Sequence, residues 1–326
     1  MKRLPLSVVV PTYRNTLRLR ELLGSLERQS RRLEYEVIVV ANLPEPGLKK
    51  VVESYGPRFR FLETGRIGAN LARNKGVERA RGDIVVFLDD DSYVSDKDFL
   101  ERVHALHESH PASLAIGGPY TLRSGATACE TAYHLVLEHR LRSSRRRYDE
   151  TSLLLGGNWS FKAHSLGARL RFDDTIAFGG TELELFARLI REGHSLLLDD
   201  SSSVVHQLRL SVWGLARRAY AQGLAFGRLA PTAGSTRHWH STLTVRECAE
   251  NAGLAWSRRV RFFALLYRKI FEYGVSVGNE RDLAPSTTLR RWLAELIVVT
   301  GNAFALAKLE AGGKTRSETA RLPADL

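Results

Sequence analysis

The chain has 326 residues, of which 44% are hydrophobic and 26% charged, and its formal net charge is +12 at pH 7. This length suits one large domain with an appendage, or two domains. Two cysteines at unrelated positions argue against a disulfide framework. No uninterrupted apolar run reaches the roughly 18 to 20 residues that cross a bilayer.

The first half of the sequence alternates short β-type runs with amphipathic helical runs. Strands are predicted at 6–10, 36–40, 58–62 and 84–88, and helices at 16–28, 47–54, 69–80 and 96–109. Repetition of this kind predicts an α/β fold with a parallel sheet between two layers of helices, an architecture that binds nucleotides.

The pattern weakens between residues 121 and 148, where we expect a mobile loop or a loose helix. A helix is predicted again at 181–191, and helical patterning dominates from Ser211 onward. We therefore expect one α/β domain at 1–230, with halves at 1–118 and 119–230, and a helical extension at 231–326. From Arg209 to the end, Lys and Arg are twice as numerous as Asp and Glu, so this extension is basic.

Three consecutive aspartates, Asp89, Asp90 and Asp91, follow the predicted strand 84–88. Ligands of open α/β sheets bind at the carboxyl ends of the strands, which is where these carboxylates should lie. Because side chains alternate along an extended chain, Asp89 and Asp91 share a face and can converge on one Mn²⁺ or Mg²⁺ ion. The alternative is a solvated turn that ends the strand.

Four segments, taken in order, resemble the family 2 glycosyltransferases over roughly residues 4–230. They are 8–14, 65–76, 82–91 and 179–184. The resemblance implies an inverting enzyme of the GT-A fold, which is Rossmann-like with a mostly parallel central sheet flanked by helices, here followed by a C-terminal helical extension. It makes 1–118 the nucleotide-sugar-binding half and 119–230 the acceptor-binding half.

The resemblance also implies a donor site for a nucleotide diphosphate sugar. Its expected contacts are Pro11, Thr12, Tyr13, Arg14, Gly68, Arg73, Asp89 and Asp90. Gly68 opens a helix whose free backbone N–H groups can face phosphate. Arg73 either binds the nucleotide or holds the aspartates in place, and a surface charge is the alternative.

Asn42 stands where the family usually carries an acidic pair that reads the base. Its carbonyl could accept the N3–H of uracil while its amide donates to O4, although another base would fit as well. Asn42 therefore leaves the base open, and a UDP-sugar is our leading hypothesis for the donor.

By resemblance Asp91 binds the metal, Mn²⁺ or Mg²⁺, and His206 stands where many relatives carry a histidine that reaches the metal or the diphosphate. A structural histidine is the alternative for His206. Glu182 takes the place of the catalytic base, which removes the proton of the acceptor hydroxyl. Another register puts Leu183 there, and an exposed acidic first turn of a helix is a further alternative.

Gly157, Asn158 and Trp159 resemble the acceptor-side loop, where an aromatic face can stack on a sugar ring, and Glu184 follows the candidate base by two residues. Trp159 would equally suit the core.

The segment 258–270 combines cations with apolar residues spaced by three or four: Val260, Phe263, Tyr267 and Ile270. Such a helix is typical of a membrane interface. The alternative is that the apolar face packs on the α/β domain. Because the first residues lack a signal-peptide pattern, we expect a cytoplasmic protein, or one bound peripherally to an anionic surface at the inner face of the cell membrane.

The sequence thus predicts a metal-dependent inverting glycosyltransferase that moves a sugar to a hydroxyl of a glycan or a lipid-linked acceptor. Competing hypotheses are a nucleotidyltransferase on a related fold and a catalytically weak relative that binds sugar nucleotides. The charge also raises the hypothesis of a nucleic-acid-binding protein, but the tail has no motif for it, so no nucleic acid is expected as a partner.

Overall fold

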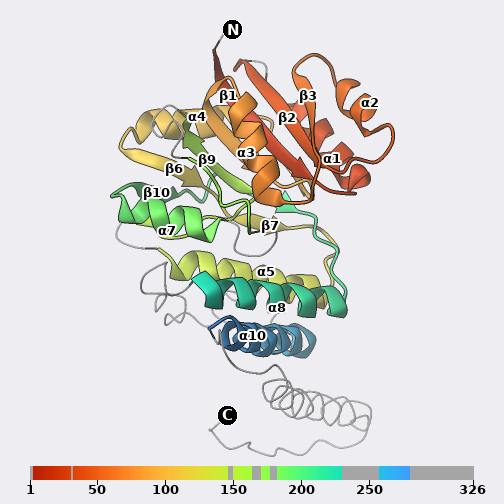
Figure 1. Ribbon diagram of the computed structural model, residues 1–326, viewed down its shortest axis with the longest axis vertical. Helices are drawn as coiled ribbons and strands as arrows, with labels where there is room; N and C mark the ends of the chain where they lie inside the picture. The colour runs from red at the N-terminus through yellow and green to blue at the C-terminus, as the bar shows by residue number, and fades with distance from the viewer. Residues whose placement is uncertain are drawn as a thin grey trace, which may run out of the picture. The chain divides into compact units, whose positions relative to one another are not determined.

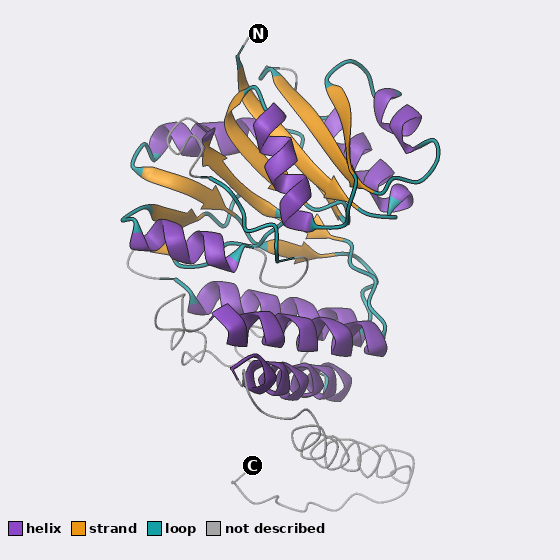
Figure 2. Cartoon of the chain, in the orientation of Figure 1, coloured by secondary structure: helices purple, strands orange, loops and turns teal. Residues whose placement is uncertain are grey.

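The computed structural model describes residues 3–30, 32–145, 150–163, 170–176, 182–229 and 257–279. Within these ranges a central sheet carries helices on both faces, and a layer of three helices packs below it in Figure 1. The same layers are coloured by secondary structure in Figure 2.

The central sheet has the strand order β3-β2-β1-β4-β9-β6-β10-β8. Its strands are β1 (Leu4–Thr12), β2 (Tyr35–Asn42), β3 (Phe59–Thr64), β4 (Gly82–Leu88), β6 (Ser113–Gly117), β8 (Glu150–Thr151), β9 (Asn158–Lys162) and β10 (Ser195–Leu198). The first four are mutually parallel, as predicted, whereas β9 runs antiparallel to both β4 and β6. The sheet is therefore mostly parallel, with β9 reversed in its interior and β8, which is antiparallel to β10, reversed at its edge.

Helices cover both faces of the sheet, which explains why its first strands are nearly continuous apolar runs. They are α1 (Thr16–Glu27), α2 (Leu48–Glu53), α3 (Ala69–Arg79), α4 (Phe99–Ser109) and α7 (Leu183–Arg191). The leucines of α1 and the apolar face of α4 share one core with β1, β2 and β4. On the other face α7 shares a second core with β4 and β9, and Ala72 of α3 packs on β2. These helices match the predicted ones to within a few residues.

A small second sheet brings distant segments to the carboxyl end of β4. It contains β5 (Ser92–Tyr93), β7 (Tyr120–Leu122) and β11 (Val204–His206), with β11 in the middle. Because β5 directly follows the three aspartates, the pairing of His206 with Ser92 places this histidine beside them.

The layer of helices below the sheet, which we call the lower layer, consists of α5 (Ala128–Ser143), α8 (Val212–Leu229) and α10 (Arg258–Asn279). The prediction of a loop or loose helix at 121–148 was wrong for α5, which is regular and begins with a capping box between Thr127 and Glu130. Its residues are buried on several sides, so no single apolar stripe marks it in the sequence.

The apolar face of α10 packs against α5 and α8. Val260 and Ala264 contact Ala132 and Leu135 of α5, and Tyr267 is only 1% exposed. In the structure this face is thus occupied by the rest of the chain, which was the alternative to a membrane-facing surface. Among the described helices, none is long and apolar enough to span a membrane.

Candidate active site

The three aspartates after β4 point to three different sets of partners. The carboxylate of Asp90 turns toward β1, where it accepts hydrogen bonds from Thr12 Oγ1 (2.5 Å) and Asn15 Nδ2 (2.8 Å). Burial, together with the nearby charges of Asp91 and Asp89, raises the pKa of Asp90 to about 7 despite these hydrogen bonds. Asp90 thus ties the site to β1.

Asp91 faces the small second sheet. His206 Nε2 lies 3.4 Å from its Oδ1, and an Arg18 nitrogen lies 4.0 Å from its Oδ2. Burial by itself would raise the pKa of Asp91, but His206, Arg218 and Arg18 lower it to about 2. Asp91 is therefore held as a carboxylate.

Asp89 faces Arg73 and Tyr120. An Arg73 guanidinium nitrogen lies 3.4 Å from Asp89 Oδ1, and the Tyr120 hydroxyl donates to Oδ2 at 3.3 Å. Burial and the charge of Asp91 raise the pKa of Asp89 although Arg73 opposes them. A Cβ at Gly157 would lie 2.3 Å from this carboxylate, so only glycine fits there. The family resemblance placed Gly157 in the acceptor-side loop; in the structure its backbone N–H donates to the Tyr120 hydroxyl at 2.9 Å.

Arg73 joins Asp89 to the candidate base. It is 4% exposed, and its other terminal nitrogen lies 3.9 Å from Glu182 Oε2. It also donates to the carbonyl of Gly156 at 3.2 Å. Glu182 stands at the N-terminal end of α7. The structure thus brings Asp89 and Glu182, far apart in the sequence, to the two sides of one buried arginine.

The predicted nucleoside side lies at the ends of β1, β2 and β3. Asn42 is buried, and its Oδ1 accepts from Thr64 Oγ1 (2.9 Å) and from Gly68 N (3.2 Å), while its Nδ2 reaches the Thr12 carbonyl at 3.4 Å. It therefore fastens the three strand ends and the start of α3 to one another. Its two carbonyl acceptor positions are filled by these internal bonds.

Exposed apolar side chains follow these three strands, in the loops after them and in the first turn of α1. They are Tyr13 (39% exposed), Leu17 (75%), Leu43 (43%) and Ile67 (51%). Arg14 is exposed too and lies over the Tyr13 ring at 5.3 Å, while Pro11 is half-buried at the end of β1. Leu43 and Ile67 were not singled out from the sequence, because isolated apolar residues in loops give no periodic signal. Leu17 was not singled out either, because it is not among the leucines of α1 that form its buried face.

The predicted acceptor residues do not form one surface. Trp159 is 1% exposed and packs among Phe87, Phe161, Phe172 and Phe186, so the expectation of an exposed aromatic face is corrected: this side chain belongs to the core. Asn158 is buried and donates to the carbonyls of Pro119 and Ser202. Glu184, in the first turn of α7, accepts from Arg188 Nε at 3.1 Å. The glycines and threonine at 179–181 lie outside the described residues.

The structure adds three residues that sequence reasoning missed. Tyr120 stacks on His206, with ring centroids 4.4 Å apart, in addition to its bonds to Asp89 and Gly157. Arg18 of α1 and Arg218 of α8 bring positive charge to Asp91. None of the three belongs to a motif that we recognised. Each lies near the aspartates because the tertiary structure brings its helix or strand there.

The donor set is compatible with Mg²⁺ or Mn²⁺. Among the described residues no three Asp, Glu, His or Cys side chains would hold a metal ion by themselves. A catalytic Mg²⁺ usually takes only one or two carboxylates and completes its shell with phosphates and water. Asp89 and Asp91 supply such carboxylates, and a dication beside them would offset the burial and the mutual repulsion that raise the pKa values of Asp89 and Asp90.

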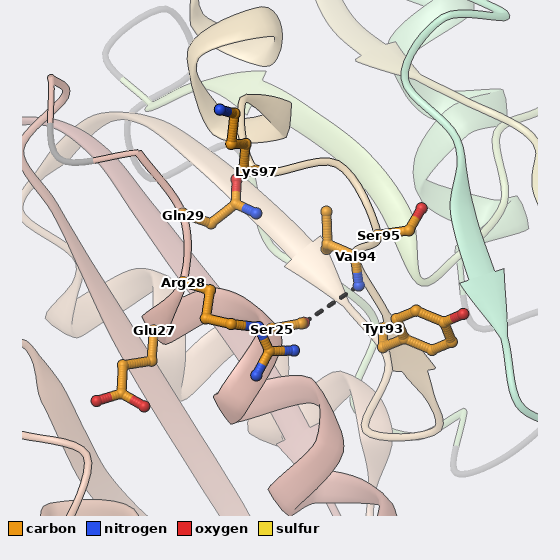
Figure 3. Close-up of a pocket in the computed structure, with 8 residues that line it drawn as sticks. All are labelled: Ser25, Glu27, Arg28, Gln29, Tyr93, Val94, Ser95 and Lys97. Atoms are coloured by element: carbon orange, nitrogen blue, oxygen red, sulfur yellow. Dashed lines mark hydrogen bonds between the residues drawn. The ribbon is translucent and has the colours of Figure 1, made fainter.

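A separate cleft of about 780 Å³ lies between the end of α1 and the segment that follows β5. Figure 3 shows its lining, in which Arg28 and Lys97 supply cations and the Val94 N–H donates to Ser25 Oγ. The aspartates do not line it.

A mostly parallel sheet with carboxylates at its strand ends and helices on both faces is the GT-A glycosyltransferase fold, which confirms the fold expected from the sequence. The family model of glycosyl transferase family 2 matches residues 7–174, and the chain belongs to this family.

Two curated relatives differ in how much of the chain they match. The succinoglycan biosynthesis protein ExoM of Rhizobium meliloti is 27% identical over 293 residues, covering 84% of this chain and 93% of that protein. The poly(ribitol-phosphate) beta-N-acetylglucosaminyltransferase TarS of Staphylococcus aureus is 32% identical over 115 residues, 34% of this chain. That match spans only 20% of TarS.

Two solved structures share the fold. The mannosyltransferase PcManGT of Pyrobaculum calidifontis, in complex with GDP-Man and Mn²⁺, superposes with a TM-score of 0.56 at 17% identity, covering 91% of this chain and 81% of that one. Residues 1–349 of TarS with UDP-GlcNAc give a TM-score of 0.51 at 16% identity, covering 83% and 81%.

Proposed function

We propose that the protein is a metal-dependent inverting glycosyltransferase that moves a sugar from a UDP-sugar to a hydroxyl of a glycan or a lipid-linked acceptor. The observation that carries this proposal is the position of Arg73, 3.4 Å from Asp89 and 3.9 Å from Glu182. A donor-side carboxylate and a candidate base then lie on either side of one buried cation.

Glu182 is the proposed general base. Its carboxylate is partly exposed, with 20% of the side chain accessible, so an acceptor hydroxyl can reach it. Inversion requires this hydroxyl oxygen to attack the anomeric carbon from the face opposite the leaving nucleotide, and Glu182 would take its proton. Base assistance of this kind is worth about 10² to 10⁴ in rate.

Asp91 and Asp89 are the proposed metal-binding side, with His206 and Tyr120 orienting the two carboxylates through their contacts. When bound, Mn²⁺ or Mg²⁺ would neutralise the charge that develops on the departing diphosphate. Thr12, Asn15 and Asp90 would hold the end of β1 beside the nucleoside. The neighbour with GDP-Man and Mn²⁺ shares only the fold, and it supports this assignment by analogy.

The direct test is product analysis. Incubation with a panel of UDP-sugars and Mn²⁺ should release UDP in the presence of a glycan or polyprenyl-linked acceptor, and chelation should stop the release. Release of pyrophosphate instead would identify a nucleotidyltransferase. Binding of UDP-sugar without any turnover would identify the catalytically weak relative.

We also propose that the lower layer, formed by α5, α8 and α10, binds an anionic membrane surface, which would suit a lipid-linked acceptor. The apolar face of α10 is packed internally, so the contact would be made by its exposed face instead. That face presents Arg258, Arg259, Arg261, Leu265, Arg268 and Lys269. Each cation near an anionic surface contributes on the order of 1 kcal/mol. At the start of α8, Trp213 is 80% exposed and Val212 48%, which adds an apolar contact.

Co-sedimentation of the full chain with phosphatidylglycerol vesicles tests the membrane proposal. Binding should weaken with salt and should fall when Arg259 and Arg261 are both changed to Glu, and Trp213→Ala should lower it further. Changing Lys49 and Lys50 on α2 both to Glu is the matched control, because it alters the net charge by the same amount. Unchanged binding of the double variant would reject the α10 surface.

A further inference from the structure

Four hydrogen-bonded side chains, which we call the polar seam, connect the three helices of the lower layer. They are Tyr133 and Arg140 of α5, Gln222 of α8 and Tyr267 of α10. Gln222 Nε2 donates to the Tyr133 hydroxyl at 2.9 Å, and its Oε1 accepts from Arg140 at 3.1 Å and from the Tyr267 hydroxyl. Both tyrosines are buried, at 3% and 1% exposed. Both ends of the Gln222 amide are therefore fixed by neighbouring helices.

Arg218 extends the polar seam to the active site. It lies one helical turn before Gln222 on α8, and its guanidinium carbon is 5.8 Å from the centre of the Tyr133 ring. Its side chain also hydrogen-bonds Tyr133, and its positive charge interacts electrostatically with the carboxylates of Asp91 and Asp89. Tyr133 thus touches Gln222 with its hydroxyl and Arg218 beside it.

The backbone packing of α8 and α10 keeps Tyr267 in register with Gln222. A Cβ at Gly223 would lie 2.2 Å from the Phe271 carbonyl oxygen, and one at Gly274 would lie 2.6 Å from the Tyr220 carbonyl oxygen. The two helices are so close that only glycine fits at these crossings. A shift of the α10 backbone would therefore also displace α8.

We propose that α10 is part of the donor site, because Tyr267 and Gln222 hold Tyr133, and Tyr133 holds Arg218 where its charge meets the diphosphate of the nucleotide sugar. The inference rests on the proposed function. Arg218 would contact the donor, whereas Tyr133, Gln222 and Tyr267 would be positioning residues. A free arginine side chain has about 2 kcal/mol of rotamer entropy, so fixing it before the ligand arrives favours binding.

The test measures the affinity of the full chain for UDP and for uridine in the presence of Mn²⁺. Arg218→Met should lower UDP affinity by about tenfold or more, the usual effect of a lost charge-assisted hydrogen bond, and leave uridine unchanged. Tyr267→Phe keeps the ring and removes only the hydroxyl, so it should fold normally and lower UDP affinity about two- to tenfold. Tyr273→Phe, on the same helix, is the matched control and should bind UDP like the wild type.

A double variant separates positioning from general damage. With Arg218→Met already present, Tyr267→Phe should cause no further loss of UDP affinity, because both changes act through one group. Additive losses, equal losses for UDP and uridine, or wild-type UDP affinity in Tyr267→Phe would each overturn the role of α10. A wild-type protein that binds neither UDP nor GDP would instead overturn the proposed function itself.

Discussion

Each end of the central strands has a cluster of polar groups around carboxylates, and the two clusters are built in opposite ways. The amino end has one fully buried carboxylate, and the carboxyl end has three, two of them only partly buried. At the amino end, Glu36 of β2 is fully buried and accepts hydrogen bonds from Ser7 Oγ (2.8 Å), the Arg81 N–H (2.8 Å) and Arg60 (2.6 Å). At the carboxyl end, Asp89, Asp90 and Asp91 crowd together and the contacts with cationic side chains are longer: Arg73 lies 3.4 Å from Asp89, and His206 and Arg18 lie 3.4 and 4.0 Å from Asp91.

The pKa values follow this difference. Burial by itself would raise the pKa of Glu36, but the hydrogen bonds from Arg81, Arg60 and Ser7 lower it overall. Burial raises the pKa values of Asp89 and Asp90, and their neighbours do not compensate. The Glu36 cluster is complete without a ligand, whereas burial and mutual repulsion at the aspartates are not fully compensated by the side chains around them. Balanced charge at one end serves stability, and unbalanced charge at the other suits binding of a cationic or metal-bound ligand.

The largest effect is expected from the base at the carboxyl end. Glu182→Gln should lower kcat by about 10² to 10⁴ because the amide cannot accept the hydroxyl proton. Binding of UDP-sugar, measured by calorimetry, should stay within a few-fold of the wild type. Glu192→Gln, at the other end of α7, is the control and should retain full activity. Full activity of Glu182→Gln would remove this residue from the mechanism.

Asp91→Ala should abolish the stabilisation that Mn²⁺ and UDP together give to the folded protein. A ligand at about 100 times its Kd stabilises by about 2.7 kcal/mol, and this gain should disappear in the variant. Thermal melting with and without ligand is the measurement. A rise in Tm equal to that of the wild type would show that Asp91 is not needed for the metal.

A pair of stability measurements sharpens the comparison itself. Glu36→Ala should cost about 1 to 3 kcal/mol. The change removes the carboxylate that accepts hydrogen bonds from Ser7, from the Arg81 backbone N–H and from the guanidinium groups of Arg60 and Arg81. Asp89→Asn, which relieves crowded charge, should leave the free energy of unfolding unchanged or raise it by about 0.5 to 2 kcal/mol. Urea denaturation of both variants checks this, and a comparable loss in both would mean that the clusters play the same role.

The smallest effect is the pH dependence of the Glu36 cluster. Since the pKa of Glu36 is lower in the folded state than in the unfolded chain, the carboxylate stabilises the fold above about pH 4.3, the ordinary value for glutamate. This contribution should be lost as pH falls through the lower folded-state pKa. The difference in Tm between wild type and Glu36→Gln should therefore shrink between pH 5 and pH 3. A difference that stays constant over this range would contradict the assignment.

Local patterns in the sequence were enough to predict the first four strands of the central sheet and the helices between them. The apolar runs of β1, β2, β3 and β4 and the helices between them are determined by short-range periodicity, and the three aspartates mark where β4 ends. The family resemblance placed Arg73, Glu182 and His206 in the site, and the structure brings Arg73 and His206 to the aspartates and Glu182 to Arg73.

Only the tertiary structure decided which polar side chains contact one another in the site and which way the side chains of β9 point. Trp159 is in the core because β9 pairs with β4 and β6, which turns its side chain toward Phe87 and α7, and no local pattern specifies that pairing. Tyr120 and Arg218 reach the carboxylates from β7 and α8, across long stretches of sequence. Periodicity reports which side of an element is apolar, whereas the meeting of two polar groups depends on how distant elements pack.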